Sequence, residues 1–230
     1  MDKRIIVFAA HPDDETLGCG GTILKKSTEG FETIIVIMTD GRHSLSENFG
    51  IVSQPTPDEL VLIRKKELSE AAKALNVPES NLWLLNFEDG TLAHHTAEAG
   101  KKVVEIMEQF RPAEVYYHYA GDSNRDHQAA SRIIAEAIDR MGLTSHQYQY
   151  SIAQTFSRIG PIVSKAMNLL LHNLVFVDVA SFVGKKETAL RKYSSQIDVI
   201  ASGQNKPVIP DLNKFLKPKE MFYYRRSFKE

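Results

Sequence analysis

The chain has 230 residues, of which 43% are hydrophobic, so it can bury a sizeable core and is too apolar for a disordered chain. Its 28 Lys and Arg nearly balance 29 Asp and Glu, and a net charge of −1 argues against a broad nucleic-acid-binding surface. The single cysteine, Cys19, excludes an intrachain disulfide and a zinc site built from several thiolates. We recognise no signal peptide and no apolar run of the roughly 18 residues that a membrane span needs. We therefore expect a cytoplasmic protein with no stable membrane insertion.

The first forty residues predict a strand, a helix and a second strand. Arg4 to Ala10 is an almost continuous apolar run, typical of a strand buried on both faces. A polar turn and a Gly-rich passage, Gly18 to Gly21, lead into an amphipathic helix that Gly30 ends. We interpret the glycines as a place of close helix–sheet packing. Thr33 to Thr39 is β-branched and should pair in parallel with the first strand.

The rest of the chain alternates between helix and strand, after an irregular polar loop over residues 41–57. Further helices are predicted over residues 57–75, 97–110, 126–141 and 185–197, and further strands over residues 81–87, 114–119, 148–156 and 174–179. This alternation predicts an α/β, Rossmann-like three-layer sandwich with a mostly parallel sheet. We expect one domain over residues 1–230.

Polar clusters follow three of the predicted strands, where parallel sheets bind their ligands. They are His11-Pro12-Asp13-Asp14-Glu15, Thr39-Asp40-Gly41-Arg42-His43 and Gly121-Asp122-Ser123-Asn124-Arg125-Asp126-His127. The three consecutive acids of the first cluster repel one another, and a divalent cation would relieve that repulsion. His11, one of these acids and His127 would supply two nitrogens and an oxygen, which suits a catalytic zinc site with an open position.

Other interpretations of the same residues stay open at this point. The acids after the first strand suit a helix N-terminus, where the macrodipole favours negative charge. Asp126 and His127 suit a helix cap followed by a surface histidine. The glycines at 18–21 suit a phosphate cradle, although they match neither common phosphate-binding pattern. Cys19 has no evident neighbouring base that would make it a nucleophile.

The cluster Ala10-His11-Pro12-Asp13-Asp14-Glu15, at the end of the first strand, resembles the signature of the LmbE-like/PIG-L family of zinc-dependent N-deacetylases. Asp126-His127 resembles the second metal motif of that family. Weaker similarities are scattered as far as Ile197. They are Arg64 with Glu67, Ala71, Ala72 and Leu75, then Asp89-Gly90, Lys185 or Lys186, Tyr193 and Ser195-Gln196.

The resemblance implies roles for several of these residues. His11, Asp14 and His127 would bind zinc, with ferrous iron as an alternative because the same ligands suit both metals. Asp13 would be the general base. Arg64 would bind polar groups of the substrate. Asp126 would orient a nearby metal ligand or an arginine.

Two positions depart from the family pattern. Asn124 stands where some members carry a histidine that stabilises the oxyanion, and an amide can donate a hydrogen bond but carries no charge. His118 is a second candidate for this role. Arg42 stands where many members have Glu, and it would suit an anionic part of the substrate.

The resemblance implies hydrolysis of the N-acetyl group of an N-acetylglucosamine-type sugar conjugate, a small-molecule substrate. Three alternatives remain: a zinc amidase acting on another amide such as a thiol conjugate, a metal-dependent phosphohydrolase, and a non-catalytic sugar- or nucleotide-binding module. We expect the insertion at 41–57 and the segment 142–173 to determine the substrate. The segment 155–173 is a candidate lid or contact surface of a homo-oligomer.

Overall fold

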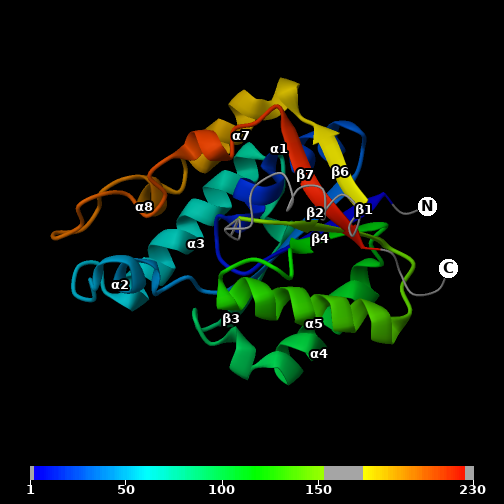
Figure 1. The fold of residues 1–230 in the computed structure, drawn as a ribbon, viewed down its shortest axis with the longest axis horizontal. Helices are drawn as coiled ribbons and strands as arrows, with labels where there is room; N and C mark the ends of the chain where they lie inside the picture. Colours follow the sequence, from blue (N-terminus) through cyan, green and yellow to red (C-terminus); the bar gives the residue numbers. More distant parts are fainter. Residues whose placement is uncertain (1–2, 153–172, 226–230) are drawn as a thin grey trace, which may run out of the picture.

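A seven-stranded sheet organises the computed structural model, which describes residues 3–152 and 173–225 (Figure 1). The strand order is β3-β2-β1-β4-β5-β7-β6. The first five strands pair in parallel, and β7 runs antiparallel to both of its neighbours. The strands are β1 (Arg4–Ala9), β2 (Glu32–Thr39), β3 (Leu82–Phe87), β4 (Glu114–His118), β5 (His146–Tyr150), β6 (Asn173–Asp178) and β7 (Lys219–Arg225).

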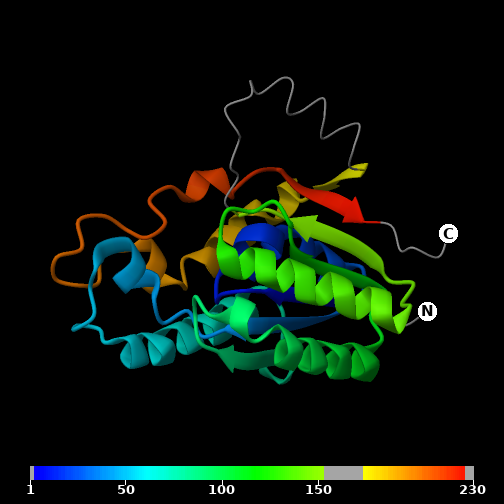
Figure 2. The ribbon, with the colours of Figure 1, turned by 60° about the horizontal axis from the view of Figure 1, so that its bottom comes forward.

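Helices cover both faces of this sheet, so the predicted α/β sandwich with a mostly parallel sheet is confirmed (Figures 1 and 2). The α-helices are α1 (Asp14–Thr28), α2 (Ser44–Phe49), α3 (Pro57–Ala74), α4 (Thr96–Phe110), α5 (Arg125–Met141), α7 (Val183–Leu190) and α8 (Ser194–Ile197). Short 3-10 turns lie at η1 (Glu79–Asn81), η2 (Leu92–His94), η3 (Ala180–Phe182) and η4 (Leu212–Lys214). Helices α4 and α5 form one outer layer, and α1, α3 and α7 form the other.

Strand β1 shows why the sheet is buried on both sides. Ile6 and Phe8 pack into the core beneath α4 and α5, while Ile5 and Val7 pack into the core beneath α1 and α3. All four side chains are fully buried. Because neighbouring side chains of a strand point to opposite faces, a continuous apolar run is what such a central strand requires.

The glycines after the first strand lie inside α1, which begins at Asp14 rather than after the Gly-rich passage. A Cβ on Gly18 would stand 2.3 Å from Tyr150 Cδ2, and one on Gly21 would stand 2.7 Å from Val179 Cβ. Close packing is therefore the reason for these glycines, as predicted. Gly30 follows the helix with a φ of +79°, the left-handed conformation expected after a helix end.

Three predicted elements differ from the structure, and one further strand was not predicted. The loop 41–57 contains the short helix α2, and the predicted strand 148–156 ends at Tyr150 within the described residues. The predicted helix 185–197 is split into α7 and α8, because the Glu67 carboxylate accepts a hydrogen bond from Ser195 N at 2.7 Å and starts a new helix there. Strand β7 was not predicted. Of the candidate lid or oligomer segment 155–173, all but Asn173 lie outside the described residues, and Asn173 begins β6.

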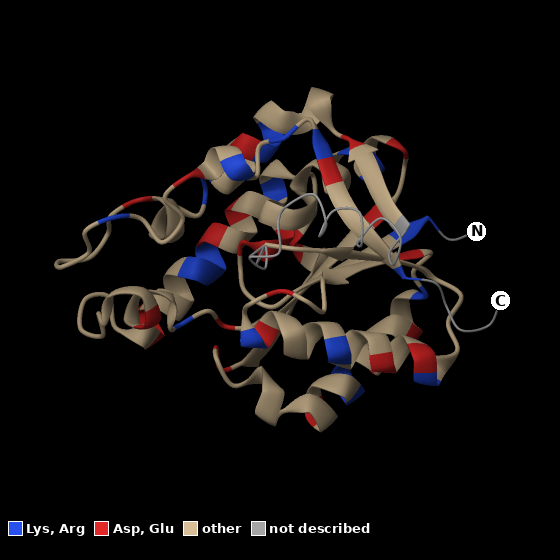
Figure 3. Ribbon diagram, viewed as in Figure 1, with Lys and Arg blue, Asp and Glu red and all other residues tan. Residues whose placement is uncertain are grey.

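Charged residues of both signs are interspersed over the helices and loops (Figure 3). In β1 and β2 the only charged residue is the first of each strand, Arg4 and Glu32. In the described ranges, no helix combines the length and the apolar character that crossing a bilayer would require.

Candidate metal and active site

The polar clusters predicted at the strand ends meet where the order of the sheet changes direction. Strand β1 lies between β2 and β4, and His11 follows β1 while His127 lies in the first turn of α5, after β4. Successive crossovers on opposite faces leave a crevice at such a point, and open parallel sheets bind their ligands there. The sheet thus brings together residues that are 116 positions apart in the sequence.

The three predicted metal ligands face one another. His11 Nδ1 lies 3.1 Å and His127 Nε2 3.2 Å from the same oxygen, Asp14 Oδ2, and the two ring nitrogens lie 3.3 Å apart. Each residue therefore turns a potential ligand atom to a common centre. Two imidazole nitrogens and one carboxylate oxygen form a donor set suited to zinc or ferrous iron. The residues present fit a divalent transition metal.

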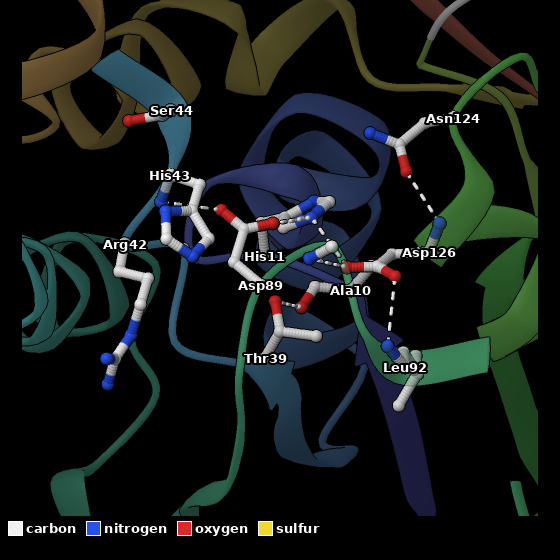
Figure 4. Close-up of polar contacts among 12 residues, drawn as sticks. Ala10, His11, Thr39, Arg42, His43, Ser44, Asp89, Leu92, Asn124 and Asp126 are labelled. Atoms are coloured by element: carbon white, nitrogen blue, oxygen red, sulfur yellow. Dashed lines mark hydrogen bonds and ion pairs between the residues drawn. The ribbon is translucent and has the colours of Figure 1, made fainter. Parts of the chain in front are cut away.

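Carboxylates also contact the second nitrogen of each imidazole, the one that does not face Asp14. The second nitrogen of His127, Nδ1, lies 3.1 Å from Asp122 Oδ1. His11 Nε2 lies 3.0 Å from Asp89 Oδ1 and 3.5 Å from Asp126 Oδ2 (Figure 4). Such a carboxylate fixes the ring orientation and the tautomer of a metal-binding histidine. Asp126 lies among these carboxylates, and its role in orienting a ligand stays a prediction.

Asp13 adjoins the ligand residues in an unusual conformation. It precedes α1 with a φ of 123°, and its side chain is buried against the Arg64 guanidinium, with Nη2 3.0 Å from Asp13 Oδ2. Burial raises the pKa of Asp13 to about 8, even though the positive charge of Arg64 opposes that rise. A carboxylate whose pKa is raised toward neutrality is a better proton acceptor.

The two candidate substrate-binding arginines are both engaged with the protein. The Arg64 side chain is 3% exposed and donates to Gly41 O at 2.9 Å as well as to Pro12 O. Arg42 is more open, with 28% of its side chain exposed, and it contacts Asp40 at 2.8 Å and Asp58 at 3.2 Å. Of the two, Arg42 is the one that reaches solvent.

The two candidate oxyanion residues occupy different surroundings. His118 is fully buried, stacks on the His127 ring at 3.8 Å and accepts a hydrogen bond from Ala10 N through Nε2. Burial lowers the pKa of His118 to about 4, so its ring is neutral. Asn124 is half-buried and caps α5 through Oδ1, which accepts hydrogen bonds from Asp126 N and His127 N (Figure 4).

Residues 6–138 match the family model named PIG-L and described as GlcNAc-PI de-N-acetylase. The chain belongs to the PIG-L family. The predicted family is confirmed, and with it the predicted class of N-deacetylase enzymes.

Relatives agree with this PIG-L assignment, and a solved structure shares the fold. The chain is 28% identical over 160 residues to a probable N-acetyl-α-D-glucosaminyl L-malate deacetylase 2 of Bacillus cereus, covering 69% of this chain and 71% of the relative. It is 29% identical over 203 residues to the diacetylchitobiose deacetylase of Thermococcus kodakarensis, covering 84% and 70%. The fold superposes on the N,N′-diacetylchitobiose deacetylase of Pyrococcus horikoshii with a TM-score of 0.72 at 23% identity, over 97% of this chain and 84% of that one.

Sequence reasoning assigned no role to Asp122 and none beyond a turn to Asp89, although both carboxylates lie against the histidines of this PIG-L site. Asp122 stands five positions before His127, inside the polar cluster already noted. The sequence therefore marked Asp122 as part of a polar cluster, but it gave no feature that distinguished Asp122 from its neighbours. Asp89 follows β3, two strands away from β1 in the sheet, and only the assembled sheet brings it to His11 after β1.

Proposed function

We propose that this protein is a metal-dependent hydrolase that removes the N-acetyl group from an N-acetylglucosamine-type sugar conjugate. One observation carries the proposal: two imidazoles and a carboxylate converge on one point, and the buried carboxylate of Asp13 adjoins them in the chain. The names of the relatives in Bacillus and Thermococcus support an amino-sugar substrate.

We assign metal binding to His11 Nδ1, Asp14 Oδ2 and His127 Nε2, because these atoms face one another. We infer zinc, with ferrous iron as the alternative, since nitrogen and carboxylate ligands suit both ions. When bound, such an ion supplies a Lewis acid for the acetamide carbonyl and makes water acidic enough to lose a proton near neutral pH.

Asp13 is the general base of this proposal. Its carboxylate accepts one proton from water as the water oxygen attacks the acetyl carbon. The protonated Asp13 then donates to the sugar nitrogen as the C–N bond breaks, so that acetate and a free amine leave. Its raised pKa suits both steps, because the group must accept and release a proton near neutral pH.

Asn124 is the better candidate for a donor to the oxyanion. Its Oδ1 caps α5, and its Nδ2 makes no hydrogen bond to any residue in 3–152 or 173–225. Nε2 of His118, by contrast, already accepts the Ala10 amide hydrogen inside the core. Arg42 is assigned to an anionic part of the substrate, since the side chain of its partner Asp58 is 88% exposed and such a pair exchanges readily.

The Asp13→Asn variant tests this function. Acetate and amine release are measured on diacetylchitobiose and on N-acetylglucosamine linked to an acidic group. The metal content of each protein is measured in parallel. We expect the variant to keep its metal and to lose activity by a factor of about 10² to 10⁴. The exposed Glu88→Gln variant is a matched control that should stay active.

Full activity of Asp13→Asn would overturn its role as the base. A wild-type protein that binds these sugars but releases no acetate would indicate the non-catalytic binding module, and cleavage of other amides alone would indicate the broader amidase. Two further predictions, one domain over residues 1–230 and a homo-oligomer, are checked by limited proteolysis and light scattering.

A further inference from the structure

Glu15 is a buried acid that has no part in the proposed function. It lies in the first turn of α1, directly after the ligand Asp14, and its side chain is fully buried. In the part of the chain that the structure describes, its carboxylate accepts hydrogen bonds from neutral groups, namely Asp13 N at 3.0 Å, the Thr16 hydroxyl and the Tyr193 hydroxyl. Burial raises the pKa of Glu15, and these hydrogen bonds oppose that rise. Because a buried acid is costly, the contacts that it makes need a reason, and one of them leads to Asp13.

Asp13 has a backbone conformation that its neighbours must hold. Its φ of 123° and ψ of −30° lie outside the regions that residues with a side chain normally adopt. Such a conformation persists only where the surroundings over-determine it. The Asp13 carbonyl accepts hydrogen bonds from Thr16 N at 3.0 Å and Leu17 N at 2.8 Å, so the first turn of α1 holds one side. Glu15 Oε2 holds the other side, because it accepts the Asp13 amide hydrogen.

Tyr193 fixes the Glu15 carboxylate from a distant part of the chain. It lies between α7 and α8 and is buried in the core beneath α1 and α3. Its hydroxyl donates to Glu15 Oε1, the oxygen that does not accept the Asp13 amide hydrogen. Since the two oxygens belong to one rigid group, a rotation that released Asp13 would also break the contact with Tyr193.

The same core contains a second contact between a tyrosine and an acid, away from the site. Tyr116 is buried there and donates its hydroxyl hydrogen to Glu114 Oε2 at 2.6 Å. Glu114 is the first residue of β4, whereas the site residues follow the last residues of the parallel strands. Tyr116 therefore provides a matched control, in which a buried carboxylate loses a tyrosine hydroxyl at the opposite edge of the sheet.

We propose that Glu15 is a positioning residue, whose carboxylate is fixed by Tyr193 and holds the backbone of the catalytic Asp13. The inference rests on the proposed role of Asp13 as general base. Because Glu15 acts through Asp13, disturbing it should lower kcat and leave the substrate Kd and the metal content unchanged.

The Tyr193→Phe variant tests the proposal by removing one hydroxyl. Its kcat on diacetylchitobiose should fall by about 10-fold, less than the roughly 10²-fold cost of misplacing a reacting group by about 1 Å, because Thr16 still donates to Glu15 Oε1. Calorimetry in the Asp13→Asn background should give an unchanged Kd. Tyr116→Phe should keep the wild-type kcat, although it also loses a hydrogen bond to a buried carboxylate. Equal losses of kcat in the two variants, or a Kd raised by about tenfold or more in Tyr193→Phe, would overturn the proposal.

A double-mutant cycle tests whether Tyr193 acts through Glu15. Glu15→Met should lower kcat by on the order of 10²-fold, and Tyr193→Phe should cause no further loss on that background. Losses that multiply would overturn the proposal. Glu15→Gln keeps a carbonyl oxygen for the Asp13 amide and should retain more of the kcat than Glu15→Met, so equal kcat values would also overturn it. If Glu15→Met does not fold, the comparison of Tyr193→Phe with Tyr116→Phe decides.

A readout without substrate separates this inference from the proposed function. Amides of residues 11–16 should exchange hydrogen faster in Tyr193→Phe than in wild type and in Tyr116→Phe, while those of α5 should not. Unchanged exchange at 11–16 would overturn the restraint even in an active enzyme. An inactive wild type with the expected exchange would overturn the proposed function and leave the restraint standing.

Discussion

The regions on either side of residues 153–172 contribute to the site in different ways. The region from β1 to α5 supplies every candidate ligand and catalytic residue, all of them at or just after the ends of parallel strands. The region from β6 to β7 supplies none of these, yet its helix α7 packs against α1 and α3, and Lys186, Ala189 and Tyr193 of this region are buried. The candidate reactive groups therefore lie in the first region, at the ends of its strands and in the loops and first helical turns that follow. The second region stabilises α1 and α3, which pack next to them.

The contacts of the second region explain how it does so. Lys186 Nζ on α7 donates to Leu17 O of α1 at 2.8 Å and pairs with Glu220 of β7 at 2.7 Å. The same carboxylate accepts hydrogen bonds from Gly21 N and Thr22 N of α1. Tyr193 donates its hydroxyl hydrogen to Glu15 Oε1, next to the site. These buried polar contacts join α1 to two later elements.

The largest effect is expected from removing a ligand of the first region. His127→Ala should lose its bound metal and its activity, because a single imidazole and a carboxylate hold a divalent ion far more weakly. Elemental analysis and acetate release measure both. A chelator should reproduce the loss in wild type, and added zinc should reverse it. The exposed His94→Ala variant is the matched control, and metal retained by His127→Ala would contradict the ligand assignment.

Lys186→Met should lower stability while leaving activity nearly unchanged, which would separate the role of the second region from that of the first. It leaves the buried Glu220 unpaired, which costs about 3–5 kcal/mol of stability and lowers the Tm by about 10 °C for a chain of this size. The kcat of the folded molecules should change little. Thermal unfolding and activity at low temperature measure the two effects. The neighbouring exposed Lys185→Met is the control; an unchanged Tm in Lys186→Met would show that the second region does not support α1.

Asp122→Asn should give a smaller effect confined to the metal. Losing the carboxylate behind His127 is expected to weaken metal affinity by about 10- to 100-fold. Competition with a chromogenic chelator measures it, and activity at saturating zinc should recover largely. If affinity is unchanged, the 3.1 Å contact between His127 and Asp122 does not orient the ligand.

Arg42→Ala should give the smallest effect, and only with some substrates. For a sugar with an acidic group we expect kcat/KM to fall by about 5-fold, the size of a partly exposed ion pair. Diacetylchitobiose, which is neutral at this position, should be cleaved as before. The exposed Arg140→Ala variant serves as control. Equal losses with both substrates would exclude a role of Arg42 in recognising anions.

The first region was largely predictable from local patterns. The apolar run of β1, the glycines of α1 and the polar clusters after β1 and β4 are each encoded within a few neighbouring residues. The second region was predicted less well. Strand β7 escaped because its short run, Lys219–Arg225, becomes a strand by pairing with β5 and β6, partners far away in the chain. The split between α7 and α8 depends in the same way on Glu67, more than 120 residues earlier.

The amino-acid sequence by itself determined the parallel sheet, the family and the residue types that can hold a metal, because periodicity and short motifs are local. Only the tertiary structure decided which nitrogen of each histidine faces Asp14, which carboxylates stand behind the rings, and that Arg64 points at Asp13. The physical reason is that a side chain's partners depend on distances between elements, and packing sets those distances after the elements have formed.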